Sequence, residues 1–336
     1  MTRKATILIA IIIILTGCEK VLIEEDLNND PLTNFNYLWE TVDKKYSFFD
    51  YKNIDWDSVY YAYRPRIHEN MTEQALFNIM AGMLNALKDG HVNLKSDFNR
   101  SRYWDWKLNY PSNFNPKIIE REYLQDDYRI SGGLKNRYLD SIGYIYYESF
   151  SLDVSDANID SVISYFEEAK GIIIDIRDNG GGSVSNGNRI IRRFLKKKTL
   201  VAYTRYKKGP GHQDFTEPIP EYLSPDGEKQ LADKPVMVLI NHGCYSAAND
   251  FASKMSVLPN VWLIGAKTGG GGGLPIYNEL PNGWTFRFSS NIGLSADSVN
   301  IENGVEPDLK ASTPFFSETD SIIETAIEII NEKTPH

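Results

Sequence analysis

One serine lies where a nucleophile would be well supported. Ser246 falls between a buried apolar run, residues 235–240, and a stretch with helical character. A serine there gains from the positive end of the helix dipole, and the N–H of Ala247 can face a developing negative charge. Serine also favours helix N-caps, so a structural role stays open. Cys244 is a rival nucleophile, although a strand-end cysteine is typical of a small buried side chain.

Two glycine-rich segments offer backbone donors for such chemistry. Residues 179–182 (Asn-Gly-Gly-Gly) follow the apolar run 171–177, and residues 269–273 are five consecutive glycines. Glycines let the chain turn sharply and aim N–H groups at one point, which suits a carboxylate, a phosphate or an oxyanion. A structural turn explains the first segment as well. The second lacks the residue order of a phosphate-binding P-loop, which disfavours nucleotide binding.

Two of the five histidines are candidates for the general base. His91 follows a predicted helix that ends near Gly90, and His242 lies four residues before Ser246. A neutral imidazole can take a proton from serine and return it to a leaving amine. The other histidines, in polar or terminal stretches, are His68, His212 and His336. The residue pattern alone leaves both candidates open.

Buried apolar strands alternate with helices from residue 142 onward. This alternation predicts an α/β fold with a mostly parallel sheet covered on both faces. In such sheets ligands bind beyond the carboxyl ends of the strands, where the serine and the glycine segments lie. The predicted strands are 142–147, 171–177, 235–240 and 261–265, and the predicted helices are 159–170, 185–194 and 245–255.

The first hundred residues differ from the rest. Helical spacing of apolar side chains over 35–99 predicts a small N-terminal helical domain. Residues 100–141 mix aromatic, Pro and Asn residues in short alternating stretches such as 117–121, which predicts short strands and loops. Residues 142–336 then form the predicted catalytic core.

The N-terminus carries an export signal. Basic Arg3 and Lys4 precede a short apolar run, residues 7–15, that ends in Leu-Thr-Gly-Cys at Cys18. This run is too short to span a bilayer and is typical of a signal peptide, while its end resembles the bacterial lipobox. We therefore predict a signal peptide over 1–17, lipid on Cys18 and a flexible tether over 18–34, which anchors the chain to a membrane of the bacterial cell envelope.

Composition excludes several other classes. The 336 residues carry a formal net charge of −9, which disfavours nucleic-acid binding because phosphate recognition needs a basic surface. Only two cysteines are present, so with Cys18 lipidated no disulfide can form within one chain. No Cys/His cluster predicts a metal, and no motif predicts a cofactor. The oligomeric state is left open.

An ordered set of motifs carries a family resemblance. The motifs are residues 175–182 (DIRDNGGG), 245–251 (YSAANDF), 265–268 (GAKT) and 304–308 (GVEPD), with 87–91 (LKDGH) upstream. Their order resembles tail-specific, or C-terminal processing, peptidases and the tricorn protease core. The resemblance implies a crotonase-like fold and hydrolysis of a peptide or protein substrate through an acyl-enzyme on Ser246. It also implies an oxyanion hole from Gly181 or Gly180 with Ala247.

The same resemblance addresses the base. Ser-Lys members of the family carry a lysine where this chain has Gly271, and Lys267 lies too early in the motif to replace it. Tricorn-like members use a histidine and a glutamate, which carry over to His91 and Glu302. Their serine immediately before the histidine is Gly90 here. An exposed, solvated carboxylate is the alternative for Glu302.

Two other functions remain open at this point. The superfamily includes a retinoid-binding protein, so an inactive member that binds a ligand or acts as a scaffold is one alternative. A crotonase-like acyl-CoA enzyme is another, although the export signal disfavours it. Only about forty residues separate Arg100 from Ile142, too few for the peptide-binding PDZ domain of many processing peptidases.

Overall fold

A seven-stranded sheet forms the centre of the larger of two units. A computed structural model describes residues 28–108, 110–227, 230–314 and 316–333. Five neighbouring strands are parallel and the last two, at one edge, are antiparallel. In spatial order the strands are β13 (Leu309–Lys310), β9 (Val261–Gly265), β8 (Val236–Ile240), β5 (Gly171–Asp175), β4 (Ile142–Tyr146), β3 (Leu134–Leu139) and β2 (Arg129–Ser131).

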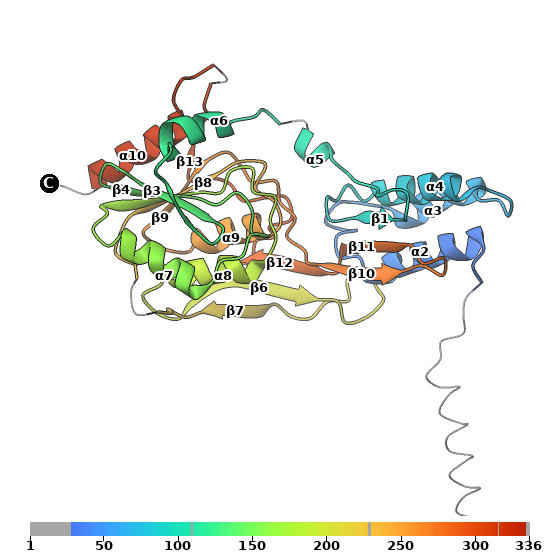
Figure 1. Ribbon diagram of the computed structural model, residues 1–336. Coiled ribbons are helices and arrows are strands. Elements are labelled where there is room, and N and C mark those ends of the chain that lie inside the picture. The colour runs from blue at the N-terminus through green and yellow to red at the C-terminus, as the bar shows by residue number, and fades with distance from the viewer. Residues whose placement is uncertain (1–27, 109, 228–229, 315, 334–336) are drawn as a thin grey trace, which may run out of the picture.

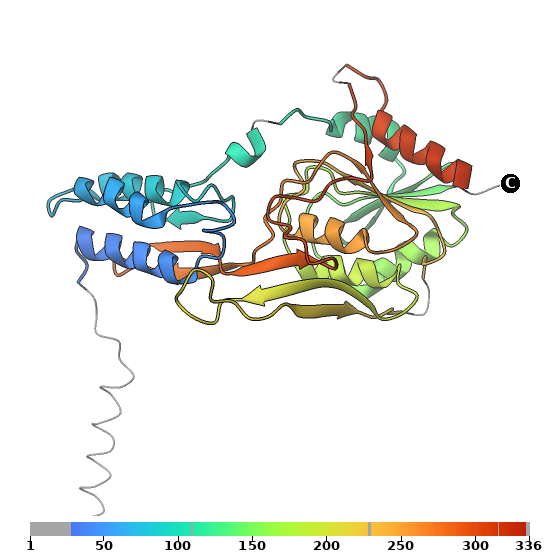
Figure 2. The same ribbon diagram turned by 180° about the vertical axis from the view of Figure 1, so that it is seen from behind.

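Helices cover both faces of this sheet (Figures 1 and 2). Because side chains alternate along a strand, Ile172 and Ile174 of β5 pack with one helix layer and Ile173 with the other. The first layer is α7 (Asp156–Tyr165), α8 (Val184–Arg192) and α9 (Ala247–Met255); the second is α10 (Ser321–Lys333) with α6 (Pro116–Ile118) and the π-helical turn η2 (Ile119–Leu124). The predicted α/β core with a mostly parallel sheet is confirmed.

Two smaller sheets accompany the large one in the described part of the chain. One is β12 (Asn291–Ser295), β6 (Thr199–Tyr206) and β7 (Ile219–Leu223), and the other is β1 (Asn93–Lys95), β11 (Thr285–Ser289) and β10 (Pro275–Glu279). The second belongs to the N-terminal unit, whose helices are α2 (Pro31–Lys45), α3 (Trp56–Tyr63), the short 3-10 turn η1 (Arg64–Arg66) and α4 (Glu73–Asn85). A short helix, α5 (Asp105–Leu108), lies on the segment that returns to the core (Figure 1).

The N-terminal unit is not built from residues 35–99 alone. The β10–β11 hairpin, which the sequence assigned to the core, pairs with β1, and its Trp284, Phe286 and Phe288 are buried among the helices of this unit. The predicted boundary at residue 142 therefore needs correction. Aromatic residues on one face of a strand need an apolar partner, and here that partner lies almost two hundred residues earlier.

Two local predictions also change. The stretch 117–121, predicted as a strand, is helical because Asn115 caps Lys117 N–H and Pro116 suits the first helical turn. The predicted tether extended to residue 34, but α2 begins at Pro31 with the Asp30 side chain capping Thr33 N–H.

The predicted signal peptide and Cys18 lie outside the described residues. Within the described ranges, no helix combines the length and the apolar character needed to cross a bilayer.

Candidate active site

Ser246 lies at the turn between β8 and α9 in an unusual backbone conformation. Its φ is 57° and its ψ is −120°, which a residue with a side chain adopts only when its surroundings enforce it. Ser246 holds the N-cap position of α9, but its side chain makes no capping hydrogen bond. A sharp strand-to-helix turn of this kind pushes a nucleophile out of the backbone and toward a cavity.

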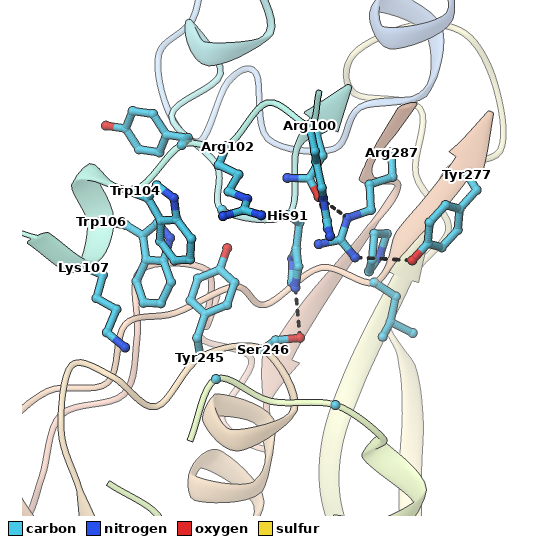
Figure 3. Close-up of a pocket in the computed structure, with 17 residues that line it drawn as sticks. His91, Arg100, Arg102, Trp104, Trp106, Lys107, Tyr245, Ser246, Tyr277 and Arg287 are labelled. Carbon is cyan, nitrogen blue, oxygen red and sulfur yellow. Dashed lines mark hydrogen bonds between the residues drawn. The ribbon is translucent and has the colours of Figure 1, made fainter. Parts of the chain in front are cut away.

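His91 faces this hydroxyl. Its Nε2 lies 2.9 Å from Ser246 Oγ (Figure 3), although 155 residues separate the two in the chain. Burial, which the charge of Asp89 opposes and the charges of Arg287 and Lys52 reinforce, lowers the pKa of His91 to about 4. The ring is therefore neutral at pH 7 and able to accept a proton.

Asp89 holds the turn that carries His91. One of its carboxylate oxygens accepts the His91 backbone N–H at 2.8 Å, and the other accepts the Tyr46 hydroxyl at 3.0 Å. The Tyr245 hydroxyl approaches the first oxygen at 3.4 Å. Because Tyr46 and Tyr245 come from the two different units, this buried carboxylate joins both units at the site.

Glu302 does not contact the His91 ring, contrary to the predicted orienting role. One Glu302 oxygen accepts the Gly272 N–H at 2.8 Å and the other pairs with Lys52 at 2.7 Å. The atom beside His91 Nδ1 is instead Ser289 Oγ of β11, at 3.4 Å. With Nε2 facing Ser246 as acceptor, Nδ1 carries the proton and donates to this buried hydroxyl.

Lys52 lies between two buried carboxylates, Glu302 at 2.7 Å and Asp89 at 3.7 Å. Burial and the charge of Asp89 raise the pKa of Glu302 to about 7, and Lys52 opposes this shift. For Asp89, burial favours the neutral acid, but Lys52 and His91 together lower its pKa. At pH 7 Asp89 is therefore ionised and Glu302 is about half ionised, so the charge of Lys52 offsets most of the negative charge of the two carboxyls.

Two backbone N–H groups remain for an oxyanion. The predicted donor Gly181 already donates its N–H to Asn179 Oδ1 at 3.0 Å. Among the described residues, Gly180 and Ala247 have no acceptor for theirs, and Gly180 lines the same cavity as Ser246. Gly181 has a steric role instead, since a Cβ there would lie 2.9 Å from Ser246 Cβ. Gly180 with Ala247 is the pair that the geometry favours.

The rival groups point elsewhere. Burial raises the pKa of the Cys244 thiol, whose sulfur lies 2.9 Å from the Ile176 carbonyl oxygen. His242 Nε2 contacts the Trp106 carbonyl oxygen, and its ring stacks on Tyr110. Lys267 is exposed and pairs with Glu306 at 3.2 Å.

Two glycines, Gly271 and Gly90, stand where related peptidases carry a lysine or a serine, and neither position has room for a side chain. A Cβ at Gly271 would lie 2.6 Å from the Tyr245 ring, so the lysine of Ser-Lys members has no room. A Cβ at Gly90 would lie 2.6 Å from Trp106 Nε1, so the tricorn serine has none either. The Ser289 hydroxyl, which comes from another strand, lies next to the histidine instead.

These groups open onto a cavity of about 680 Å³ between the two units. Figure 3 shows Trp104 and Trp106 on one side of Ser246, and Arg287 and Tyr277 on the other. Trp106 stacks on Tyr245 with ring centroids 4.1 Å apart, so aromatic rings form a continuous wall. A nucleophile, a neutral base and backbone donors at one cavity are what acyl transfer requires.

Comparison with known proteins decides the family. Residues 141–311 match peptidase family S41, and residues 28–85 match the tricorn protease C1 domain. The chain belongs to peptidase family S41. The predicted relationship to tail-specific and tricorn-type peptidases is thereby confirmed.

Individual S41 relatives differ in how much they share with this chain. The carboxy-terminal processing protease CtpA of Bacillus subtilis (strain 168) is 30% identical over 179 residues, 53% of this chain and 36% of that protein. The chain thus spans about a third of the length of the curated relatives that it matches. A crystal structure of a candidate peptidase from Parabacteroides merdae ATCC 43184 is 46% identical, covers 90% of this chain and 98% of its own, and has a TM-score of 0.85.

More distant solved structures share the fold. Mature CPAF has a TM-score of 0.66 at 13% identity, covering 91% of this chain and 96% of its own. The tricorn protease has a TM-score of 0.54 at 15% identity, covering 91% of this chain and 37% of its own.

Sequence reasoning missed three residues of this site. Ser289 sits on a short strand with no motif around it, and Lys52 lies in an N-terminal loop far from every singled-out residue. Asp89 was inside the 87–91 motif, and the signal that could have found it is its place two residues before His91, where an Asp side chain bonds the following backbone.

Proposed function

We propose that the chain is an exported serine peptidase that cleaves peptide or protein substrates through an acyl-enzyme on Ser246. The observation that supports this most is the 2.9 Å contact of Ser246 Oγ with His91 Nε2, made by a serine held at φ 57°. A serine that only capped a helix would need neither the strained backbone nor a neutral imidazole at its hydroxyl.

The proposed chemistry uses groups of this chain only. As Ser246 Oγ bonds to the substrate carbonyl carbon, His91 Nε2 takes its proton and the oxyanion accepts N–H bonds from Gly180 and Ala247. The imidazolium returns the proton to the amine as the C–N bond breaks. Water then attacks the ester, with His91 again as base, and frees the serine. The Asp89 charge favours the imidazolium during both steps.

A fluorophosphonate probe tests the nucleophile and the base. Labelling is expected at Ser246 and is expected to vanish in Ser246→Ala and fall by orders of magnitude in His91→Ala. Lys267→Ala, which alters an exposed pair, is the control and should label normally. Unlabelled native protein would instead indicate the alternative, an inactive relative that binds a ligand or serves as a scaffold.

We further propose that Cys18 carries lipid and tethers the peptidase to a membrane of the bacterial cell envelope. The basic residues before the apolar run 7–15 and the Leu-Thr-Gly-Cys end support this. Cys18→Ser is expected to abolish labelling by a radioactive fatty acid and to release the protein from membranes. Cys244→Ser is the matched control and should stay labelled; lipid on the Cys18 variant would reject the proposal.

A further inference from the structure

Three arginines face the active-site cavity without an acidic partner. Arg100, Arg102 and Arg287 line the cavity, and among the described residues none of them has a carboxylate oxygen within 4.0 Å. Arg177, by contrast, is buried between two carboxylates. In a chain of net charge −9, unmatched positive charge at a catalytic cavity indicates an anion that arrives with the substrate.

Two of these arginines share one acceptor. Asn93 of β1 lies opposite Arg287 of β11, which lies opposite Tyr277 of β10, so the three side chains form a row across the sheet. Arg287 Nε donates to Asn93 Oδ1 at 2.8 Å, and Arg100 Nη2 donates to the same oxygen at 2.6 Å. Figure 3 shows the two guanidinium groups side by side at the edge of the cavity that His91 and Ser246 occupy.

The buried Asn93 side chain holds Arg100 and Arg287 in place, but the positive charges of the two arginines are not neutralised by a carboxylate. Asn93 is buried, and its Nδ2 donates to the Val92 carbonyl, which orients the oxygen toward the arginines. Burial, followed by the charges of Arg287 and Arg102, lowers the pKa of Arg100. One neutral oxygen cannot compensate two cations, so most of their N–H groups remain available to an anion.

We propose that Arg100 and Arg287 bind a carboxylate of the peptide substrate beside the scissile bond. The inference rests on the proposed peptidase function and adds a preference to it. A planar carboxylate matches the guanidinium fork, and a peptide can supply one from an Asp or Glu side chain or from its own C-terminus. The Trp104 and Trp106 rings lie on the other side of Ser246, where they would contact an apolar part of the same substrate.

Paired peptides test the preference. Fluorogenic substrates that differ only by Glu or Gln at each position around the cleaved bond are compared, each with a free and with an amidated C-terminus. The full chain is expected to favour one carboxylate-bearing member about tenfold or more in kcat/KM, because charge-assisted hydrogen bonds discriminate at this level. A preference that survives amidation assigns the carboxylate to a side chain, and one that disappears assigns it to the C-terminus.

Variants connect the preference to the two arginines. The double variant Arg100→Gln/Arg287→Gln should lose the discrimination, so that the ratio of kcat/KM between the carboxylate-bearing and the neutral peptide falls from about tenfold to about one. Arg66→Gln, whose guanidinium stacks on Tyr63 outside the cavity, is the control and should keep the discrimination. Equal cleavage of all native pairs, or unchanged discrimination in the double variant, would overturn the proposal.

A binding measurement separates this proposal from the peptidase function. Fluorescence anisotropy of the same labelled peptides with Ser246→Ala reports affinity without turnover. Tighter binding of the carboxylate-bearing peptide, lost when both arginines are replaced, supports the subsite even if the native chain cleaves nothing. Cleavage by the native chain with equal binding of Glu and Gln peptides, free or amidated, rejects the subsite and leaves the peptidase function standing.

Discussion

Burial decides the chemistry of His91. A carboxylate beside a histidine normally raises the pKa of the ring above its ordinary value of about 6.5. In the structure the ring is almost wholly enclosed, and the loss of hydration outweighs the field of Asp89. The base is thus neutral well below physiological pH.

The first prediction is a low-pH activity limb. With the pKa of His91 lowered to about 4, kcat/KM should rise with pH through about 4 and be flat above about 6. The same shift affects folding: below about pH 6.5 the histidine of the unfolded chain binds a proton that the folded ring does not. The free energy of unfolding should therefore fall as the pH drops from about 6.5 to about 4. The activity limb is checked by measuring kcat/KM against pH on a neutral peptide, and an inflection near pH 6.5 would contradict the prediction.

The second prediction concerns Ser289 as a positioning residue. A net hydrogen bond contributes about 1 kcal/mol, so Ser289→Ala should lower kcat about fivefold while KM changes little. Ser290→Ala is the matched control on the next residue and should keep native kcat. Ser289→Thr retains the hydroxyl and should restore part of the rate. Equal kcat in the Ser289 and Ser290 variants would remove Ser289 from the site.

The parts of the site predicted from sequence were those that local motifs carry. Ser246 and His91 lie in short segments of the ordered motif set, and the family resemblance of that set singled them out. Glu302 lies near the site but does not contact His91, because its carboxylate binds Lys52 and the Gly272 N–H while the Ser289 hydroxyl of β11 lies beside His91 Nδ1. Contacts between distant segments leave no local pattern to read.

At the scale of elements, one loop and one strand hold the base in place. The loop after α2 brings Lys52 to the carboxylates of Asp89 and Glu302, and β11 brings Ser289. The core strands were predictable because their apolar runs are continuous. The three-residue strand β1 was not, since its partner β11 determines that it is a strand at all.

The third prediction tests the lysine. Lys52→Met leaves two buried carboxylates without a cation and should cost about 3–5 kcal/mol at pH 8. Because the folded pKa of Glu302 lies above its unfolded value, the protonated form stabilises at low pH and that stability is lost as pH rises through about 7. Urea denaturation should therefore show a smaller loss at pH 5.5 than at pH 8.

The control for that experiment is Lys44→Met. Lys44 makes an exposed pair with Glu40 on α2, so its loss should cost under about 0.5 kcal/mol at either pH. Equal losses at both pH values in Lys52→Met would show that the lysine acts through packing alone.

At the scale of the whole molecule, the β10–β11 hairpin joins the two units (Figure 1). It leaves the core, pairs with β1 and returns as β12 to the second sheet of the core. The catalytic pair thus spans both units: His91 comes from the N-terminal unit and Ser246 from the core. The hairpin crosses the boundary that the sequence placed between the N-terminal helical domain and the core.

The fourth prediction tests this joint. Phe288 is fully buried against Tyr46, so Phe288→Ala should cost about 3–5 kcal/mol of unfolding free energy and most of the activity. Phe98→Ala, which alters a ring that is 45% exposed, should cost much less. Thermal unfolding measures the stability of both variants, and labelling by the fluorophosphonate probe measures their activity. Normal labelling of Phe288→Ala would mean that the hairpin does not position His91.

The hairpin also sets when the enzyme can first become active. Leu94 pairs with Phe286, so the N-terminal unit lacks part of its core until nearly two hundred further residues have been added to the growing chain. At about 5–20 residues per second, this delay lasts roughly 10–40 s of synthesis. A nascent chain therefore cannot bring its base and its nucleophile together until β11 has been synthesised.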